Sequence, residues 1–361
     1  MKKRTKKKDL AGFLIIIFVL MALSGITFAV FQRYIVSKNK SILRHVSDHA
    51  EVSDERPEPL LDEDVIDAQI KEQLDKAKEE KSLKKKKDEE KKTVSVDLIV
   101  FAGQSNMAGW GGDAAKAPLL TEGAGAEFRA VSDPTKLYTI TEPFGFYENT
   151  TTMNDMFLKR GSLVTSFVNA YYKETGVPVI AVSASKGGTP STYWATEVVA
   201  EDVITRYINA KEWLNNNGYS IRNQFMVFLQ GENDVLENVS NDQYLADINT
   251  FASKVMYRGI DKFMMIRIGR TIGDADAYDR IIKLQTELCR TDPRFVMISM
   301  MLSKLDTDMM VDDYHYGQEA LNEVGADAGE NAAHFAETRH DPVLTDYRTG
   351  EIYEPIQYEG L

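Results

Sequence analysis

Residues 94–109 read VSVDLIVFAGQSNMAG, an apolar run rich in β-branched and aromatic residues that ends in a turn of small residues. A short run of this kind, bounded by glycine, predicts a buried β-strand over residues 94–102. In an open α/β sheet, ligands bind just beyond the carboxyl ends of the strands. The residues that follow this strand, Gln104, Ser105 and Asn106, are therefore candidates for a functional site.

The pattern continues along the chain, because short apolar runs alternate with segments of helical period. Strands are predicted at residues 94–102, 177–185, 224–230, 263–269 and 296–300, and helices at residues 163–176, before Tyr219, and at residues 244–259, 278–290 and 318–337. This alternation predicts a central parallel sheet covered by helices on both faces, a three-layer α/β/α structure. Residues 110–160 and the tail from Thr338 lack it and are expected to be irregular. We expect one domain over residues 94–361.

The N-terminal quarter has a different composition. Residues 1–9 are basic, and residues 10–31 hold an apolar stretch long enough to cross a bilayer as a helix. This length favours a retained anchor over a cleaved signal peptide, whose apolar run is shorter. The basic flank predicts a single-pass protein with a cytoplasmic N-terminus and the remaining chain outside the cell membrane. Residues 32–93 are highly charged and are expected to form a solvated stalk, with a short coiled coil as the alternative.

Charge and cysteine content exclude some classes of function. The formal net charge is −12, with the acidic excess concentrated after residue 94, so the phosphates of a nucleic acid would be repelled. Cys289 is the only cysteine, which excludes an intramolecular disulfide and a multi-cysteine metal site. It lies on the apolar face of a predicted helix and is expected to serve packing.

Two further predicted strands end in motifs that suit a ligand site. KGGT at residues 186–189 follows the second strand, where paired glycines let the backbone approach a ligand and point an amide toward it. QGEND follows the third strand, where the Gln230 amide can donate to a developing oxyanion. Glu232 and Asp234 are positioned to fix the neighbouring loops. Each motif alone is also compatible with an ordinary solvated turn.

A general base is expected at His315, because histidine titrates near neutral pH and this histidine follows a pair of carboxylates. On one helical turn Asp312, three residues earlier, can meet the ring and fix its tautomer. Asp313 is the alternative if the segment is extended. His334 and His340, the other histidines of this region, are expected to be structural or solvated.

GQSNM, KGGT, QGEND and DDYH, in this order, resemble the motifs of the SGNH hydrolases. The resemblance is specifically to the carbohydrate esterases that include sialate O-acetylesterases and acetylxylan-esterase-like enzymes. It covers nearly all of residues 94–335 and implies a flavodoxin-like fold. It also implies Ser105 as nucleophile, His315 as base and Asp312 as the carboxylate that pairs with the base.

The resemblance further implies how the rest of the site is built. The oxyanion hole would consist of the backbone amide of Ser105, a backbone amide at Gly188 and the side chain of Gln230. The supporting positions would be Gln104, Asn106, Gly187, Glu232 and Asp234. Asn233 stands where the family usually has serine, and the other residues of that motif are kept. No cofactor and no metal are implied.

The expected function is hydrolysis of acetyl esters on a carbohydrate, by acyl transfer through Ser105. The partner is left open among cell-wall, capsular and plant polysaccharides and sialic acid. Trp110, Tyr193 and Trp194 are candidates to stack on sugar rings, with core packing as the alternative. The rival functions are a non-catalytic glycan-binding surface module and an esterase or lipase that acts on longer acyl chains.

Overall fold

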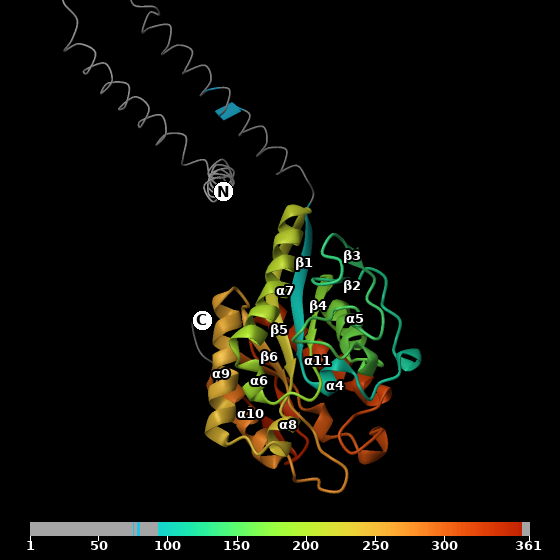
Figure 1. Cartoon of the computed structure of the whole chain (residues 1–361), viewed down its shortest axis with the longest axis vertical. Coiled ribbons are helices and arrows are strands. Elements are labelled where there is room, and N and C mark those ends of the chain that lie inside the picture. The colour runs from blue at the N-terminus through green and yellow to red at the C-terminus, as the bar shows by residue number, and fades with distance from the viewer. Residues whose placement is uncertain (1–74, 76–77, 80–92, 356–361) are drawn as a thin grey trace, which may run out of the picture. The chain divides into compact units, whose positions relative to one another are not determined.

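The first predicted strand, β1 (Val94–Gly103), lies in the middle of a seven-stranded sheet in the computed structural model, which describes residues 75, 78–79 and 93–355 (Figure 1). The chain divides into two units, residues 1–84 and 85–361. The predicted basic tail, the predicted membrane span and nearly all of the predicted stalk lie outside the described residues. Within the described part of the chain, no helix is long and apolar enough to cross a membrane.

The central sheet is parallel, as predicted, except at one edge. Its strand order is β3-β2-β4-β1-β5-β6-β7, and β3 runs antiparallel to β2. The other six strands of this sheet are β2 (Gly125–Phe128), β3 (Leu137–Tyr138), β4 (Val179–Ser185), β5 (Tyr219–Leu229), β6 (Lys262–Ile266) and β7 (Phe295–Ser299). Because β4, β1 and β5 are parallel neighbours, the three predicted motifs that follow them meet at one edge of the sheet.

Helices cover both faces of the sheet, which gives the predicted three-layer arrangement (Figure 1). On one face lie α5 (Val164–Thr175) and α11 (Gln318–Thr338), and on the other lie α7 (Glu197–Asn216), α9 (Asn241–Tyr257) and α10 (Asp279–Thr291). Short helices follow the central strands directly: α4 (Ser105–Ala108), α6 (Ser191–Trp194) and α8 (Glu232–Leu236). Single 3-10 turns are η1 (Ala114–Lys116), η2 (Met156–Leu158), η3 (Met301–Ser303) and η4 (Thr307–Met309).

The pairing of α5 with α11 depends on glycines. α5 ends at Gly176, which adopts a left-handed φ of 65°, as its predicted stop requires. In α11, a Cβ at Gly325 would lie 2.3 Å from the carbonyl oxygen of Leu163, and one at Gly329 would lie 2.4 Å from that of Phe167. The two helices therefore approach more closely than any larger residue at these positions would allow.

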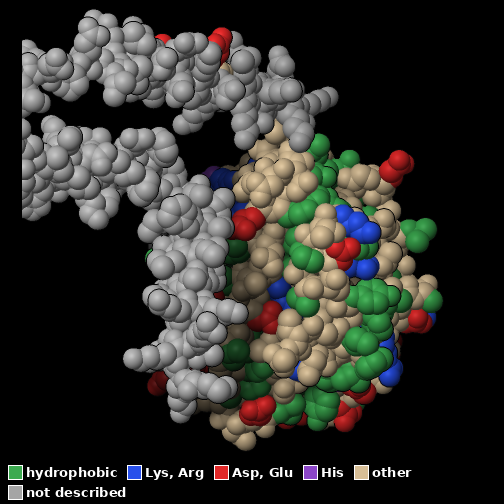
Figure 2. All heavy atoms as spheres, turned by 45° about the horizontal axis from the view of Figure 1, so that its top comes forward, with side chains coloured by type: hydrophobic (Ala, Val, Ile, Leu, Met, Phe, Trp, Pro, Cys, Tyr) green, Lys and Arg blue, Asp and Glu red, His purple; other side chains and the backbone are tan. Residues whose placement is uncertain are grey.

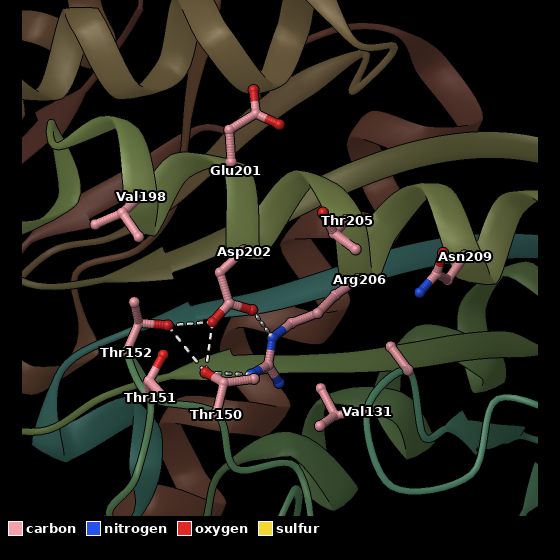
Figure 3. Close-up of a pocket in the computed structure, with 11 residues that line it drawn as sticks. Val131, Thr150, Thr151, Thr152, Val198, Glu201, Asp202, Thr205, Arg206 and Asn209 are labelled. Carbon is pink, nitrogen blue, oxygen red and sulfur yellow. Dashed lines mark hydrogen bonds and ion pairs between the residues drawn. The ribbon is translucent and has the colours of Figure 1, made fainter. Parts of the chain in front are cut away.

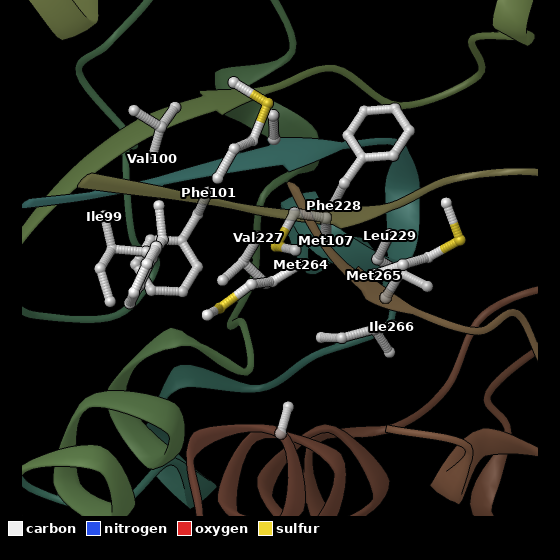
Figure 4. Close-up of a cluster of buried hydrophobic side chains, with 14 of the residues drawn as sticks. Ile99, Val100, Phe101, Met107, Val227, Phe228, Leu229, Met264, Met265 and Ile266 are labelled. Carbon is white, nitrogen blue, oxygen red and sulfur yellow. The ribbon is translucent and has the colours of Figure 1, made fainter. Parts of the chain in front are cut away.

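The core lies around β1, β5 and β6, whose inward side chains interlock (Figure 4). Phe101, Phe228 and Met264 are almost completely buried there, and burial of such a side chain stabilises the fold by about 1.5–3 kcal/mol. Cys289 is buried with its sulfur 3.8 Å from that of Met265, and burial raises the pKa of its thiol. The prediction that this cysteine serves packing is confirmed.

Two segments are more regular than the sequence predicted. Residues 110–160 contain β2 and β3, which extend the sheet but are too short to give a periodic signal. The tail contains a hairpin of β8 (Leu344–Asp346) and β9 (Glu351–Tyr353). Its Asp346 carboxylate accepts hydrogen bonds of 2.7 and 2.6 Å from the buried guanidinium of Arg267, so the tail is fixed beside the end of β6.

The face of the molecule shown in Figure 2 carries both acidic and basic side chains. Acidic and basic side chains lie interspersed with hydrophobic ones there, rather than in one continuous field of a single sign. A nucleic-acid-binding face would instead carry a continuous basic patch.

Candidate active site

Ser105 lies at the carboxyl end of β1, where the chain turns into α4. The turn requires glycine at position 103, because its φ is 137° and a Cβ would lie 2.1 Å from the carbonyl oxygen of Leu229 in β5. Ser105 is 4% exposed. Among the described residues, no acceptor takes a hydrogen bond from its backbone N–H. The turn therefore presents a hydroxyl and an unpaired amide at the same point.

His315 lies on a turn just before α11 and contacts Asp312. The Nδ1 atom of the ring is 2.8 Å from Oδ2 of Asp312, whose Oδ1 accepts the backbone N–H groups of Tyr314 and His315 at 2.9 Å. Burial acts to raise the pKa of Asp312, but these hydrogen bonds outweigh it and lower the pKa below its usual value. Asp313 instead has its carbonyl bonded to the backbone N–H of Ile272. Of the two predicted carboxylates, Asp312 is thus the one that meets the imidazole.

Asn106 joins the Ser105 turn to the His315 turn. Its amide nitrogen donates to the carbonyl of Tyr314 at 3.2 Å, and its amide oxygen accepts the N–H of Tyr316 at 3.2 Å. These two backbone groups lie on either side of His315. The residue after the serine therefore holds the backbone on both sides of the histidine, although the two turns are some 200 positions apart in the sequence.

Two buried carboxyl groups from α8 fix the loops around this junction. Glu232 accepts a second hydrogen bond from Asn106 at 2.8 Å, and Asp234 accepts the backbone N–H of Ser191 at 2.9 Å. Burial raises the pKa of Glu232 and of Asp234, more than their hydrogen bonds lower it. Gln104 adds a weak contact of 3.4 Å from the N–H of Asn233. Within the described part of the chain, no three acids, histidines or cysteines gather as a metal site requires.

Gly187, which is buried, and Gly188, which is exposed, form the corner after β4. Gly188 has a left-handed φ of 68°, and among residues 93–355 its N–H finds no acceptor. The N–H of Gly187 donates to Asp155 at 2.8 Å. A Cβ at Gly187 would lie 2.1 Å from the ring of Trp110, so only glycine allows the indole to lie against this loop.

The Gln230 side chain is turned toward neighbouring acceptors. Its amide nitrogen donates to the carbonyl of Thr189 at 3.1 Å and to the carboxylate of Asp234, which uses both of its hydrogens. Its amide oxygen is buried without a hydrogen-bond partner among the described residues. In this arrangement Gln230 has no donor left for an oxyanion, and that predicted role requires the amide to turn.

The three predicted sugar-stacking aromatics have separate locations. Trp194 is completely buried against Phe228 and Phe251, so it is a core residue and the stacking prediction is wrong for it. Tyr193 is half-buried, and its hydroxyl donates to the carbonyl of Thr152 at 2.6 Å. Trp110 lies beside the site, with its ring centroid 5.7 Å from that of His315.

The sequence prediction did not include a buried ion pair that lies within residues 110–160, next to the site. Asp155 accepts hydrogen bonds from Gly187 and Trp110, and Lys159 lies one helical turn later with its Nζ 3.8 Å from the Asp155 carboxylate. The spacing of four residues is common on exposed helices and gave no sign of burial. The segment that carries the pair has no periodic pattern that points to a site.

A surface groove of about 440 Å³ lies beside the same segment, lined by residues 130–131, residues 150–152 and one side of α7 between residues 198 and 209 (Figure 3). None of the predicted site residues lines it. Its polar groups bond mainly to one another, since Asp202 accepts from Arg206 at 2.7 Å and from the hydroxyl of Thr150 at 2.5 Å. Arg206 also donates to the carbonyl of Glu148 at 3.0 Å. The groove thus marks where the segment before Asp155 is anchored to α7.

Comparison with models of known protein families gives a match over most of the described chain. A family model described as carbohydrate esterase, sialic acid-specific acetylesterase, matches residues 95–334. No curated protein matches the chain. Among solved structures, a protein from Arabidopsis thaliana is 18% identical, with a TM-score of 0.50 over 67% of this chain and 98% of that chain. This likeness shows the fold.

Two further solved structures are more distant. A carbohydrate acetylesterase from Xanthomonas citri is 14% identical, with a TM-score of 0.42 over 69% of this chain and 58% of that chain. An acetyl-xylooligosaccharide esterase from Geobacillus is 11% identical, with a TM-score of 0.36 over 66% of this chain and 94% of that chain.

Proposed function

The chain belongs to the carbohydrate esterase family of sialic acid-specific acetylesterases, within the SGNH hydrolases, and on this premise we propose that it deacetylates a glycan by a Ser-His-Asp mechanism. We further propose that residues 10–31 anchor it in the cell membrane with the esterase domain outside. The mechanism rests above all on one observation. Asn106, next to Ser105, bonds to the backbone on both sides of His315, whose ring meets Asp312 at 2.8 Å.

The proposed proton path follows from what each atom can accept. An ionised carboxylate only accepts hydrogen bonds, so Nδ1 of His315 carries a hydrogen toward Asp312 and Nε2 is free to take one. Nε2 removes the proton from the Ser105 hydroxyl as its oxygen attacks the acetyl carbonyl carbon. The bond to the sugar oxygen then breaks, and that oxygen leaves with the proton from His315. A water molecule, deprotonated in turn by His315, releases acetate and restores Ser105.

The oxyanion of each tetrahedral intermediate is assigned first to backbone donors. The N–H groups of Ser105 and Gly188 are unpaired among the described residues, which suits them to a transient negative charge. Gln230, the third donor that the family resemblance implies, would join them on turning away from Asp234. No step of this scheme requires a metal or an organic cofactor.

The substrate class is an acetylated carbohydrate, in keeping with the family. The half-buried indole of Trp110, beside His315, offers an apolar wall for a sugar ring or for the acetyl group. Tethering at a membrane favours a polysaccharide met at the cell surface, such as a cell-wall or capsular polymer. Plant polysaccharide and sialic acid are the other candidates that the assay must include.

The experiment is acetate release by the full chain in detergent, from a panel of acetylated glycans and a chromogenic acetyl ester, beside Ser105→Ala. Release that is lost in the variant supports a serine acetylesterase and ranks the glycans. Binding of a glycan without turnover would replace this proposal with a glycan-binding surface module. Faster hydrolysis of butyryl or octanoyl esters than of acetyl esters would replace it with a lipase-like esterase.

The membrane proposal has its own test. The full chain should sediment with membranes, resist extraction by salt and alkali, and lose its C-terminal domain to protease added outside intact cells. A variant with three charged residues placed within residues 10–31 should become extractable. Recovery of the unaltered chain in the soluble fraction at full length would reject the anchor, and recovery of a shortened chain would indicate a cleaved signal peptide.

A further inference from the structure

A buried carboxylate outside the predicted triad contacts both walls of the site. The side chain of Asp155 is 1% exposed. Its Oδ2 accepts the backbone N–H of Gly187 at 2.8 Å and the indole N–H of Trp110 at 3.0 Å. We infer that Asp155 is a positioning residue for the acetylesterase reaction, which holds the Gly188 amide and Trp110 in place around Ser105. The inference rests on the function proposed above.

The first consequence concerns the oxyanion donor. Gly187 and Gly188 share a peptide unit, and Gly188 is exposed with a left-handed φ that glycine adopts freely. Without a further contact, a flexible glycine pair would leave the direction of the unpaired Gly188 N–H undefined. The hydrogen bond to Asp155 fixes the Gly187 end of this pair, and thereby restricts where the next N–H points. Misplacement of a catalytic donor by about 1 Å can cost about a hundredfold in rate.

The second consequence concerns the aromatic wall. Trp110 lies against Gly187 on one side, and on the other its ring is inclined by 45° to that of His315 at a centroid distance of 5.7 Å. Its backbone N–H donates to the carbonyl of Ser105 at 3.1 Å. One carboxylate oxygen of Asp155 therefore sets the orientation of a side chain that lies between the histidine and the glycine loop, in a residue whose backbone is bonded to the serine turn.

Lys159 places a buried basic group beside Asp155. The lysine side chain is 2% exposed, and its Nζ lies 3.8 Å from Oδ1 of Asp155 and donates to the Ser185 hydroxyl at 3.0 Å. Burial lowers the pKa of Lys159, and the Asp155 charge acts against this lowering. Buried ion pairs seldom add stability over apolar residues of the same size. The pair is thus better explained by orientation: Lys159 attracts Oδ1, which leaves Oδ2 for Gly187 and Trp110.

The test compares variants of the full chain on a chromogenic acetyl ester. Asp155→Ala removes both hydrogen bonds, and we expect kcat to fall about a hundredfold with KM changed less than about threefold. Asp155→Asn keeps one acceptor oxygen but turns an amide nitrogen toward Lys159, so kcat should fall only about tenfold. The matched control is Asp97→Ala, which removes a buried carboxylate paired with Arg222 at the opposite end of β1. It should lower the Tm and leave kcat within about threefold.

Several outcomes would overturn the inference. Asp155→Ala with kcat near that of the unaltered chain would do so, as would a loss no larger than that of Asp97→Ala. Equal losses in Asp155→Asn and Asp155→Ala would reduce Asp155 to a counter-ion for Lys159. If Asp155→Ala does not fold, Asp155→Asn decides, since an unchanged kcat in that variant rejects the positioning role.

The same assay separates this inference from the proposed function. An unaltered chain without turnover would reject both, whereas an active chain whose kcat does not depend on Asp155 would reject the inference alone.

Discussion

On the His315 side of Ser105, the site is held by amide and carboxyl groups, with Asn106 bonded to the backbone around the imidazole and to the buried Glu232. No ion pair to Glu232 is present among the described residues. On the Gly188 side, the corresponding carboxylate is Asp155, and it has the buried cation of Lys159 within 3.8 Å. Each carboxyl group has one oxygen in hydrogen bonds and one without such a partner.

This difference separates two tasks that a serine esterase must perform. The His315 side must deliver and return a proton, which requires a fixed imidazole and no strong nearby cation that would lower its basicity. The Gly188 side must stabilise the negative charge that develops on the substrate oxygen. A donor loop that is anchored to a buried carboxylate holds its N–H groups in place for this task. Changes on the two sides should therefore slow turnover for different reasons and by different amounts.

The largest effect is expected at the residue that both sides share. Ser105→Ala should lower kcat by at least about 10³-fold on acetyl esters, because the nucleophile is lost while the fold and the oxyanion donors stay. Its Tm should stay close to that of the unaltered chain. The control is Ser220→Ala, an exposed position at the amino end of β5. Turnover by Ser105→Ala within tenfold of the unaltered chain would assign the nucleophile elsewhere.

Asn106→Ala tests the His315 side and should lower kcat by about a hundredfold. It removes both bonds that hold the backbone around His315, and it leaves the buried Glu232 carboxyl without its donor, at a cost of about 1–3 kcal/mol in the free energy of unfolding. Steady-state kinetics and thermal melts measure the two effects. The control is Asn169→Ala, which breaks bonds of a similar kind between α5 and the backbone of residues 119 and 121. A loss of stability without loss of kcat would show that His315 is positioned by Asp312 alone.

Gln230→Ala tests the Gly188 side, and we expect kcat to fall about tenfold with little change in KM. Both amide hydrogens of Gln230 are bonded to Thr189 and Asp234, so the amide must turn before it can donate to the oxyanion, and we expect it to contribute less than the two backbone donors. A loss of about 10²–10³-fold is typical of a full oxyanion donor and would mean that the amide turns readily during the reaction. Kinetics on the same ester, with thermal melts alongside, distinguish the two outcomes.

The two sides also differ in how far the sequence could predict them. Ser105, Gly188, Asn106 and Glu232 lie directly after predicted strands, and the parallel order of β4, β1 and β5 brings such strand ends together. Asp155 lies instead in a segment without periodicity, and its contacts depend on how that segment folds over Gly187. Loop paths of this kind are set by tertiary contacts, such as those of Arg206, which no local pattern records.

The direction of the Gln230 side chain was beyond prediction for a related reason. A motif specifies that an amide is present at the strand end, but the acceptors that orient it come from Thr189 in another loop and from Asp234 one turn later. The choice of Asp312 over Asp313 depended in the same way on whether the turn before α11 is coiled or extended. In the structure, the backbone N–H groups of Tyr314 and His315 both donate to the Asp312 carboxylate, so the turn is coiled.

Glu232→Gln should give the smallest effect, on stability rather than turnover. Burial raises the pKa of Glu232 above its ordinary value of 4.5 in spite of the hydrogen bond from Asn106. A carboxyl group whose pKa is higher in the folded chain binds its proton more tightly there than in the unfolded chain. Its ionisation therefore lowers the free energy of unfolding as the pH rises above the pKa that the group has in the unfolded chain. Glutamine keeps the acceptor for Asn106 and does not ionise.

The Tm of Glu232→Gln relative to the unaltered chain should therefore increase between about pH 4 and pH 7, by about 2–4 °C for each kcal/mol regained. Glu237→Gln, an exposed change in the residue that follows α8, should show no such trend. A Tm difference independent of pH would mean that a cation compensates Glu232 as Lys159 compensates Asp155. In that case the two sides of Ser105 would be held by the same kind of interaction, and the division of tasks between them would lose its physical basis.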